Sequence, residues 1–411
     1  MIKKTSLYKL ISTLLYLTTY IIASINIYFG FILMILFILY SSITYKYKNI
    51  LNKNVIIFIS INFFVVFIGL IMSIVNDSSS KDILRDVINT IFPSISLIYG
   101  YIFFSKYKID HIYNTIVQGG LAIAFYQLFN FIKDPTLFLQ SLRYIRIDND
   151  ASNFLLPTLA VLVVLFLRRY SEKKYFNFII ILILSASIIL SLSRTNYIIF
   201  MLISLFLLIV RPKNTFVLKN FFGVILLLAI GFTILPAHIR NEIFGKMIHS
   251  ITEVKGTGIW DFQEINSNWR GYENYLIKQQ LSNTSLLNQL FGFGFGERLQ
   301  LGVSISLAGS IYTAIPQTHS EYYYFLFKTG ILGLTLIIIM HIYLLKFSRN
   351  IMDSVSRHFA ISLSIIIAVE AVVVRGFFNS EAGFLCLSIL GGLMSINSVP
   401  IKYERIKNET S

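Results

Sequence analysis

The stretch PQTHSEYYYFLFKTGILGL, residues 316–334, joins a short polar turn to a long apolar segment. Thr318 is a predicted helix N-cap, and Glu321, three residues later, is predicted to complete a capping box. His319 would then begin the helix, where its ring can accept a proton and where free backbone N–H groups favour an anion. The stretch therefore predicts a membrane helix that starts at a polar, anion-binding edge.

The same helix carries small residues on the side of His319. Leu326, Gly330 and Gly333 return to roughly the same face at about 100° per residue. Two glycines on that face allow another helix to pack closely and would fix the position of the ring. Close packing without any catalytic role explains the glycines equally well.

Composition places the whole chain in a membrane. Of the 411 residues 55% are hydrophobic and only 13% are charged, which leaves too little polar sequence to cover a globule of this size. The N-terminal MIKKTSLYKL precedes an apolar run without a small-residue cleavage site, so we expect a retained first transmembrane helix. The single cysteine, Cys386, excludes a disulfide framework and a thiolate metal cluster.

About twelve apolar segments have spanning or near-spanning length. They are residues 6–24, 27–45, 55–75, 87–104, 112–132, 154–167, 176–192, 197–210, 217–235, 322–345, 359–374 and 382–398. We therefore predict an all-α, polytopic membrane helical bundle of about twelve transmembrane helices.

Basic clusters fall on every second connection between these segments, for example KYKNILNK (46–53), RRYSEKK (168–174) and the tail KYERIK (402–407). This pattern satisfies the positive-inside rule if both termini are cytoplasmic. Almost all of the net charge of +15 then lies on the cytoplasmic side and orients the chain in the bilayer. A nucleic-acid partner is therefore not expected.

The connections on the outer side differ in length. The longest runs from 236 to 318, between the ninth and tenth segments, and a second covers 133–152. Without a repeat, linker or low-complexity tract, residues 1–411 are predicted to form a single membrane domain with a large extracytoplasmic loop.

Outer arginines oppose the orientation rule and suit bidentate phosphate binding. Arg194 lies in SLSRTN, on a predicted external hairpin, where it would clamp a phosphate or reach the lipid head groups. Arg270 lies in SNWRGYENYLIKQQL, residues 267–281, which is predicted to form an amphipathic helix at the membrane surface. Trp269, Tyr272 and Leu276 form its apolar stripe, and they would at least anchor the loop.

Two further outer stretches carry weaker signals. RYIRIDND, residues 143–150, places Arg143 and Arg146 beside an Asp-x-Asp pair, which can hold a divalent metal and a sugar diphosphate but also occurs in solvated loops. LFGFGFGERL, residues 290–299, has alternate glycines and Arg298, but no preceding strand supports a dinucleotide fold. We expect a flexible turn there.

The stretch AVEAVVVRGFFNSEAG, residues 368–383, contains Glu370 within an apolar segment and Arg375 at its outer edge. An intramembrane carboxylate requires a partner or a function. The histidines do not have the spacing of metal ligands, so no metal and no cofactor is predicted.

Together these features resemble the bacterial O-antigen ligase and polymerase family of polytopic membrane glycosyltransferases. The similar elements are Ser193–Arg194–Thr195, the Arg270 stretch that leads to LFGFGFGE, and His319–Ser320 followed after nine residues by Gly330 and after two more by Gly333. The last spacing is similar to the ligase-type signature of the family.

The resemblance implies a GT-C-like membrane enzyme in the bacterial cytoplasmic (inner) membrane that uses an undecaprenyl-diphosphate-linked glycan as donor, without nucleotide or metal. Arg194 and Arg270 would neutralise the diphosphate, and His319 would be the general base or a phosphate ligand. Arg143, Arg146, Arg298, Glu321 and Arg375 are the candidate substrate-binding residues. Attack from the opposite face implies inversion.

Two activities remain open within the family, and two outside it. A polymerase transfers the glycan to a lipid-linked repeat unit, which idiosyncratic, aromatic-rich loops favour, whereas a ligase transfers it to lipid A-core, which the spacing from His319 to Gly330 favours. A protein-linked acceptor and a chain-length regulator as partner are also compatible. The alternatives outside the family are a flippase for lipid-linked oligosaccharide, which should show an internal repeat, and an enzyme that uses Asp148 and Asp150 with a lipid-phosphate sugar.

Overall fold

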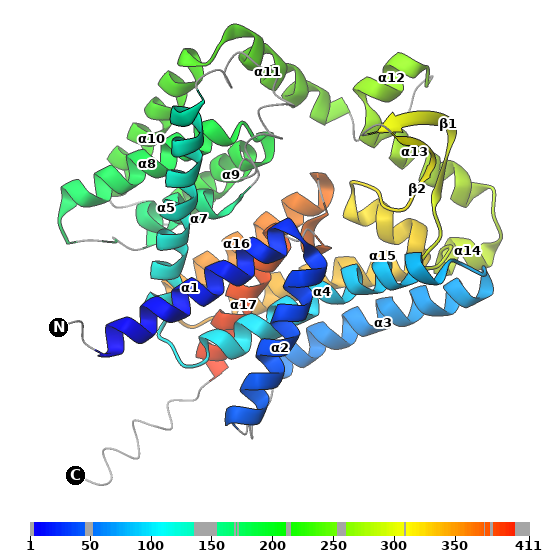
Figure 1. The fold of residues 1–411 in the computed structure, drawn as a ribbon, viewed down its shortest axis with the longest axis horizontal. Coiled ribbons are helices and arrows are strands. Elements are labelled where there is room, and N and C mark those ends of the chain that lie inside the picture. The colour runs from blue at the N-terminus through cyan, green and yellow to red at the C-terminus, as the bar shows by residue number, and fades with distance from the viewer. Residues whose placement is uncertain are drawn as a thin grey trace.

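The computed structural model describes residues 4–45, 52–134, 154–167, 170, 172–210, 215–252, 260–307, 310–373, 375–378 and 381–398. These residues form a helical body with one small sheet (Figure 1). The elements of the first half are α1 (Lys4–Ile25), α2 (Ile27–Tyr45), α3 (Lys53–Val75), α4 (Ser80–Phe104), α5 (Ile109–Lys133), α7 (Leu156–Leu162) with a π-helical turn (Val163–Leu167), α8 (Lys174–Ser191), α9 (Arg194–Val210) and α10 (Thr215–Ile234).

The second half begins with the long connection and ends with the last membrane helices. Its elements are α11 (Ala237–Thr252), α12 (Phe262–Ser267), α13 (Trp269–Ser282), α14 (Leu286–Phe291), β1 (Leu299–Leu307), β2 (Ser310–Ile315), α15 (Glu321–Arg349), α16 (Ser354–Val373), a 3₁₀ turn (Gly376–Phe378) and α17 (Ala382–Ser398).

The apolar segments predicted from the sequence each overlap an apolar helix. Within the described residues, eight helices are long and apolar enough to cross a membrane, and four shorter apolar helices are Leu156–Leu167, Tyr175–Ser191, Arg194–Val210 and Ala382–Ile396. The chain is a multi-pass membrane protein, and how many of its helices cross the bilayer stays a prediction.

The most extensive helix contact in the body joins α4 and α17. Small residues make it possible, because a Cβ atom built on Gly100 would lie 1.8 Å from the carbonyl oxygen of Ser388. Membrane helices associate through such close packing, since lipid provides no hydrophobic drive between them. The hydroxyl groups of Tyr16, on α1, and Ser388 are hydrogen-bonded at 2.7 Å, so this buried contact is also polar.

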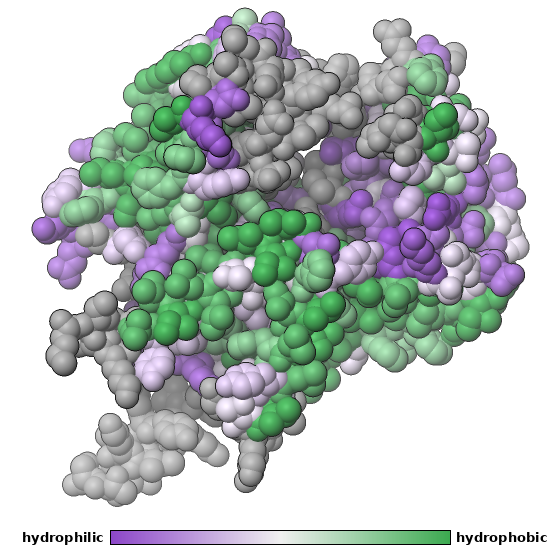
Figure 2. Space-filling model, in the orientation of Figure 1, coloured by the Kyte–Doolittle hydropathy of each residue, from purple (hydrophilic) through white to green (hydrophobic). Residues whose placement is uncertain are grey.

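The connection between α10 and α15 lies along the upper side of the body, away from the start of α1 and the end of α17 (Figure 1). On the face drawn in Figure 2, hydrophilic residues gather over α13 and α14, above a hydrophobic surface on α3. The predicted helix at 267–281 is confirmed as α13, and its Tyr272 and Leu276 are buried in a second apolar cluster with Leu301 and Phe327. These two side chains therefore pack the connection onto the body.

The described residues are mostly helical, which agrees with the predicted all-α polytopic bundle. One hairpin is an exception, in which β1 and β2 pair antiparallel, with Leu299 opposite Ile315. Leu299, Leu301 and Ile305 alternate with exposed or half-buried residues along β1 and point into the second apolar cluster. Alternation of this kind is the period-two signal of a half-buried strand. This alternation is already present in the sequence of residues 299–305.

The single straight helix predicted at 322–345 is also wrong. In a straight helix, Glu321 and His341 would lie roughly 30 Å apart, at about 1.5 Å per residue. In the structure, Nε2 of His341 lies 3.0 Å from Oε1 of Glu321. The helix reverses at Gly330, whose φ of 63° and ψ of −164° are not helical. Residues 321–329, the first arm, therefore run back along residues 331–349, the second arm.

The glycine-rich segment 292–296 closes this bend. The backbone N–H groups of Phe293 and Gly294 donate to the carbonyl groups of Phe327 and Lys328, each at 2.9 Å. In an unbroken helix these carbonyls would accept from residues beyond Gly330. Backbone groups freed at a bend must be satisfied by protein at membrane depth, and this segment provides the donors.

The expectation of a flexible turn at this segment is therefore wrong. Gly292, Gly294 and Gly296 have φ values of 80°, 89° and 85°, which glycine adopts without strain. Phe295 between them donates its N–H to Gly69 of α3 and accepts a bond from Ser73.

Candidate active site

His319 is held by the carboxylate of Glu273, which was not among the predicted site residues. Its backbone N–H donates to Oε2 of Glu273 at 2.9 Å, and its ring Nδ1 lies 3.0 Å from Oε1 of the same side chain. A carboxylate accepts hydrogen bonds, so Nδ1 carries the proton and Nε2 is left as the acceptor. The Glu273 side chain is 1% exposed and that of His319 is 44% exposed. A fixed carboxylate thus orients an accessible imidazole.

The predicted capping box is wrong. α15 begins at Glu321, its N-cap is Ser320 without a side-chain bond, and Thr318 donates its hydroxyl to the carbonyl of Ser320. The carboxylate of Glu321 instead accepts the N–H of Phe377 at 2.8 Å. Glu321 is buried, so it joins the start of the first arm to the turn after α16 and is not presented to a substrate.

Arg375 lies next to this contact. Its Nη1 donates to Oε1 of Gln317 at 2.7 Å, two residues before His319. Burial lowers the pKa of the Arg375 guanidinium below its ordinary value, whereas Tyr324 and Glu273 act in the opposite direction. Since the ordinary pKa of arginine exceeds about 12, Arg375 stays charged. The structure therefore brings this predicted residue to the His319 site.

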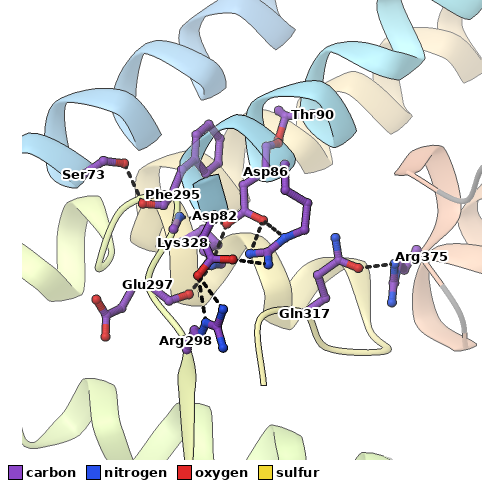
Figure 3. Close-up of polar contacts among 12 residues, drawn as sticks. Ser73, Asp82, Asp86, Thr90, Phe295, Glu297, Arg298, Gln317, Lys328 and Arg375 are labelled. Atoms are coloured by element: carbon purple, nitrogen blue, oxygen red, sulfur yellow. Dashed lines mark hydrogen bonds and ion pairs between the residues drawn. The ribbon is translucent and has the colours of Figure 1, made fainter. Parts of the chain in front are cut away.

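An ion cluster lies near Arg375, on the side of Gln317 (Figure 3). Asp86 of α4 accepts from Lys328 of the first arm at 2.7 Å and from the N–H of Gly296 at 2.9 Å. Arg85 donates to Asp86 and, at 2.6 Å, to Asp82. The side chains of Asp86 and Lys328 are 0% and 1% exposed. This cluster fixes the first arm and the glycine-rich segment to α4.

Arg298 belongs to the same cluster. Its Nε and Nη2 each lie 2.8 Å from Oδ2 of Asp82, although its side chain is 49% exposed (Figure 3). The cluster then combines three cations with two carboxylates and retains one positive charge. Arg298 links the glycine-rich segment to α4. Its guanidinium therefore has a structural partner, Asp82, where a substrate contact was predicted.

Arg270 and Arg194, the two arginines predicted to bind the diphosphate, lie on different elements. Arg270 precedes Glu273 by three residues on α13, and residues three apart share a helix face. Arg194 is the first residue of α9, after a tight turn in which Leu192 adopts a φ of 50°. α9 packs against α16, and the chain after α16 carries Arg375. Both arginines are half-buried.

The other predicted residues fall into two groups. Arg143, Arg146, Asp148 and Asp150 lie outside the described residues. Glu370 is buried on α16, as expected for an intramembrane carboxylate. Among the described residues, no group of three or more His, Cys, Asp or Glu side chains is arranged to hold a metal ion.

The sequence contained usable signals for the missed residues. Lys328 and Asp86 are charges within apolar helices, which in membrane proteins mark a partner or a function. The predicted fourth segment began at residue 87 and so excluded the acidic turn of α4. Glu273 shares a helix face with Arg270, and that spacing points to a common site.

A comparison with protein families bears on this arrangement. Residues 178–338 match the family model described as O-antigen ligase. This part, which is less than half of the chain, is similar to the O-antigen ligase family. The resemblance drawn from the motifs is thereby confirmed, and the matched segment contains Arg194, Arg270, Glu273 and His319. No curated protein matches the chain. The match indicates an activity of the ligase or polymerase kind on lipid-linked glycans in a membrane.

Proposed function

We propose that the chain is a surface polysaccharide polymerase that transfers a polyprenyl-diphosphate-linked glycan onto a lipid-linked repeat unit at the outer face of the cytoplasmic membrane. The contact between Glu273 and His319 carries this proposal. A carboxylate that holds the Nδ1 proton leaves Nε2 as a general base, which glycosyl transfer to a hydroxyl group requires.

In the proposed reaction, Nε2 of His319 takes the proton of the acceptor hydroxyl as its oxygen bonds to the anomeric carbon of the donor. The bond between that carbon and the diphosphate oxygen breaks, and the lipid diphosphate leaves with the electron pair. Attack opposite the leaving group inverts the anomeric centre. The proton on His319 then passes to solvent.

Positive charge assists departure of the diphosphate. Arg194 and Arg270 are proposed to contact it and to neutralise the charge that develops on its oxygen. Arg375, held by Gln317 two residues before His319, is proposed to provide a third cation. With this charge provided by arginines, the reaction needs neither a nucleotide nor a metal ion.

The second candidate is a ligase that transfers the glycan to lipid A-core. The spacing from His319 to Gly330 and Gly333 favours it, as does the description of the matched family model as O-antigen ligase. The loops favour the polymerase, because aromatic-rich external segments are suited to a particular repeat unit. A chain-length regulator is a compatible partner for the polymerase.

The proposal includes the bacterial inner membrane as location, cytoplasmic termini, and residues 1–411 as one membrane domain with the large outer loop at 236–318. The basic cytoplasmic connections support this orientation.

The glycan profile of a deletion strain tests the function. A lost polymerase leaves lipid A-core with a single repeat unit, whereas a lost ligase leaves long chains on the lipid carrier. Re-expression of the wild-type chain should restore the long-chain ladder, and His319→Ala should not. An unchanged ladder in the deletion strain would contradict both candidates.

A further inference from the structure

A groove lies between the two arms of α15, beside the contact between His319 and Glu273. Its empty volume is about 820 Å³, and its lining comes from both arms and from α13, namely Tyr322, Tyr323, Leu326, Leu334, Ile338 and Lys278. Tyr322 and Tyr323 follow His319 by three and four residues, and Lys278 lies on the same helix as Glu273. The groove therefore adjoins the proposed base.

The groove exists because α15 reverses at Gly330. In one straight helix, Leu326 and Leu334 would point to solvent or lipid at different heights. The reversal sets the two arms side by side, with the rings of Tyr322 and His341 at 5.7 Å between centroids. Apolar side chains of the first arm then face those of the second across an open slot.

Polarity changes along the groove. At the α13 side, Nζ of Lys278 lies 5.5 Å from the centroid of the Tyr323 ring. Lys278 is exposed, and in the described part of the chain no ion pair neutralises it. Leu326, Leu334 and Ile338 line the remainder. One cation beside an apolar slot fits an amphiphile with an anionic head and a hydrocarbon chain.

The apolar surface continues outward from the groove. Ile331, Ile339 and Ile342 of the second arm are 51%, 42% and 59% exposed, and Ile338 in the groove is 42% exposed. In a multi-pass membrane protein such side chains face lipid. A hydrocarbon chain can therefore enter the groove from the bilayer.

We propose that this groove holds the isoprenoid chain of the lipid-linked acceptor, with its phosphate beside Lys278 and its sugar at His319. The proposal rests on the proposed function and sharpens it. A single slot between two helical arms suits one hydrocarbon chain, whereas lipid A-core carries several acyl chains on one head group. The groove thus assigns the acceptor to the polyprenyl class, which is the class that a polymerase uses.

Photocrosslinking tests the occupant without relying on activity. Ile338→p-benzoylphenylalanine, placed in the groove, is compared with Ile339→p-benzoylphenylalanine, which lies about 100° further round the same arm and does not line the groove. Both are irradiated in membranes that contain lipid-linked repeat units, and the adducts are identified by mass spectrometry. We expect a polyprenyl-diphosphate glycan at Ile338 and phospholipid at Ile339. Phospholipid or an acylated glycolipid as the adduct at Ile338 would overturn the proposal.

Kinetics in proteoliposomes provide a second test, with one repeat unit attached to either a long or a short isoprenoid diphosphate. Ile338→Trp should raise KM for the long-chain acceptor about tenfold, because the lost contact of two methylene groups is worth roughly that factor. The kcat and the KM for the short-chain acceptor should change little. Lys278→Gln should raise KM for both acceptors.

Ile339→Trp is the matched control and should behave as the wild-type chain. An equal effect of Ile338→Trp and Ile339→Trp, or a fall in kcat with both acceptors, would contradict the groove assignment. If the wild-type chain transfers to neither acceptor, the proposed function fails, while the crosslinking result still decides what occupies the groove.

Discussion

At the scale of single residues, Glu273 and His319 stabilise each other. A carboxylate that is 1% exposed is costly unless hydrogen bonds satisfy it, and both oxygens of Glu273 contact His319. The ring in turn has one nitrogen fixed and the other accessible. This pair defines the direction in which His319 can accept a proton.

Glu273→Gln tests the orienting role. A glutamine amide can donate to Nδ1, which moves the ring proton to Nε2 and removes the base. We expect kcat to fall by about 10² to 10⁴-fold with little change in KM, as for other carboxylates that set a histidine tautomer. Glu264→Gln, an exposed acid on α12, is the control and should leave kcat unchanged. Equal kcat values for the two variants would exclude the orienting role.

Arginine substitutions separate the proposed phosphate contacts from the structural bridge. Arg194→Ala and Arg270→Ala should each abolish long-chain glycan at normal membrane levels, because each removes positive charge from the leaving group. Arg298→Ala should retain the glycan, since Arg298 pairs with Asp82. The measurements are glycan gels and immunoblots of membranes. Wild-type ladders from both Arg194→Ala and Arg270→Ala would refute the assignment.

At the scale of elements, the reversal in α15 shapes the site. Gly330 makes the turn, the segment 292–296 satisfies the freed carbonyls, and Asp86 with Lys328 fixes the first arm to α4. Each of these contacts joins elements that are distant in the chain. The bend therefore depends on tertiary partners as well as on glycine itself.

Gly330→Ala should destabilise the protein. A positive φ costs an alanine roughly 1–3 kcal/mol, and its Cβ would also lie 2.4 Å from the backbone of Leu290. Thermal unfolding in detergent measures the effect. Gly223→Ala is the matched control, because nothing lies within 4 Å of a Cβ there and alanine favours a helix. Equal unfolding temperatures for the two variants would show that the bend is not required.

The buried ion pair between Lys328 and Asp86 should also contribute to the stability of the fold. Lys328→Met leaves Asp86 without its buried ammonium partner and should cost about 3–5 kcal/mol of stability. Adding Asp86→Asn removes the uncompensated charge, so the double variant should lose less than the sum of the single variants. Chemical unfolding of the four proteins gives the coupling. Strict additivity would mean that Lys328 and Asp86 do not interact.

At the scale of the whole molecule, the orientation of the bundle decides which side the site faces. The basic connections predict that 236–318 is outside and that 168–174 is inside. Ser310→Cys in a Cys386→Ser background should react with an impermeant maleimide in intact cells, whereas Glu172→Cys should react only after permeabilisation. Protection of Ser310→Cys together with labelling of Glu172→Cys would reverse the topology.

Composition and local pattern were enough to predict where the apolar helices lie. Lipid requires about twenty apolar residues for each crossing, so the segments could be located without knowing how they pack. The amphipathic stripe of α13 and the spacing from His319 to Gly330 were also visible. The predicted N-cap at Thr318 and the straight helix after it were wrong, because both rested on local rules alone.

The sequence by itself therefore determined the apolar helices, the expected orientation and the segment that is similar to the O-antigen ligase family. Only the tertiary structure decided that α15 reverses, that Glu273 holds His319 and that Lys328 meets Asp86. The two members of these last pairs are 46 and 242 positions apart in the chain. A local propensity cannot report on such pairs, because their contact depends on the packing of separate helices and strands.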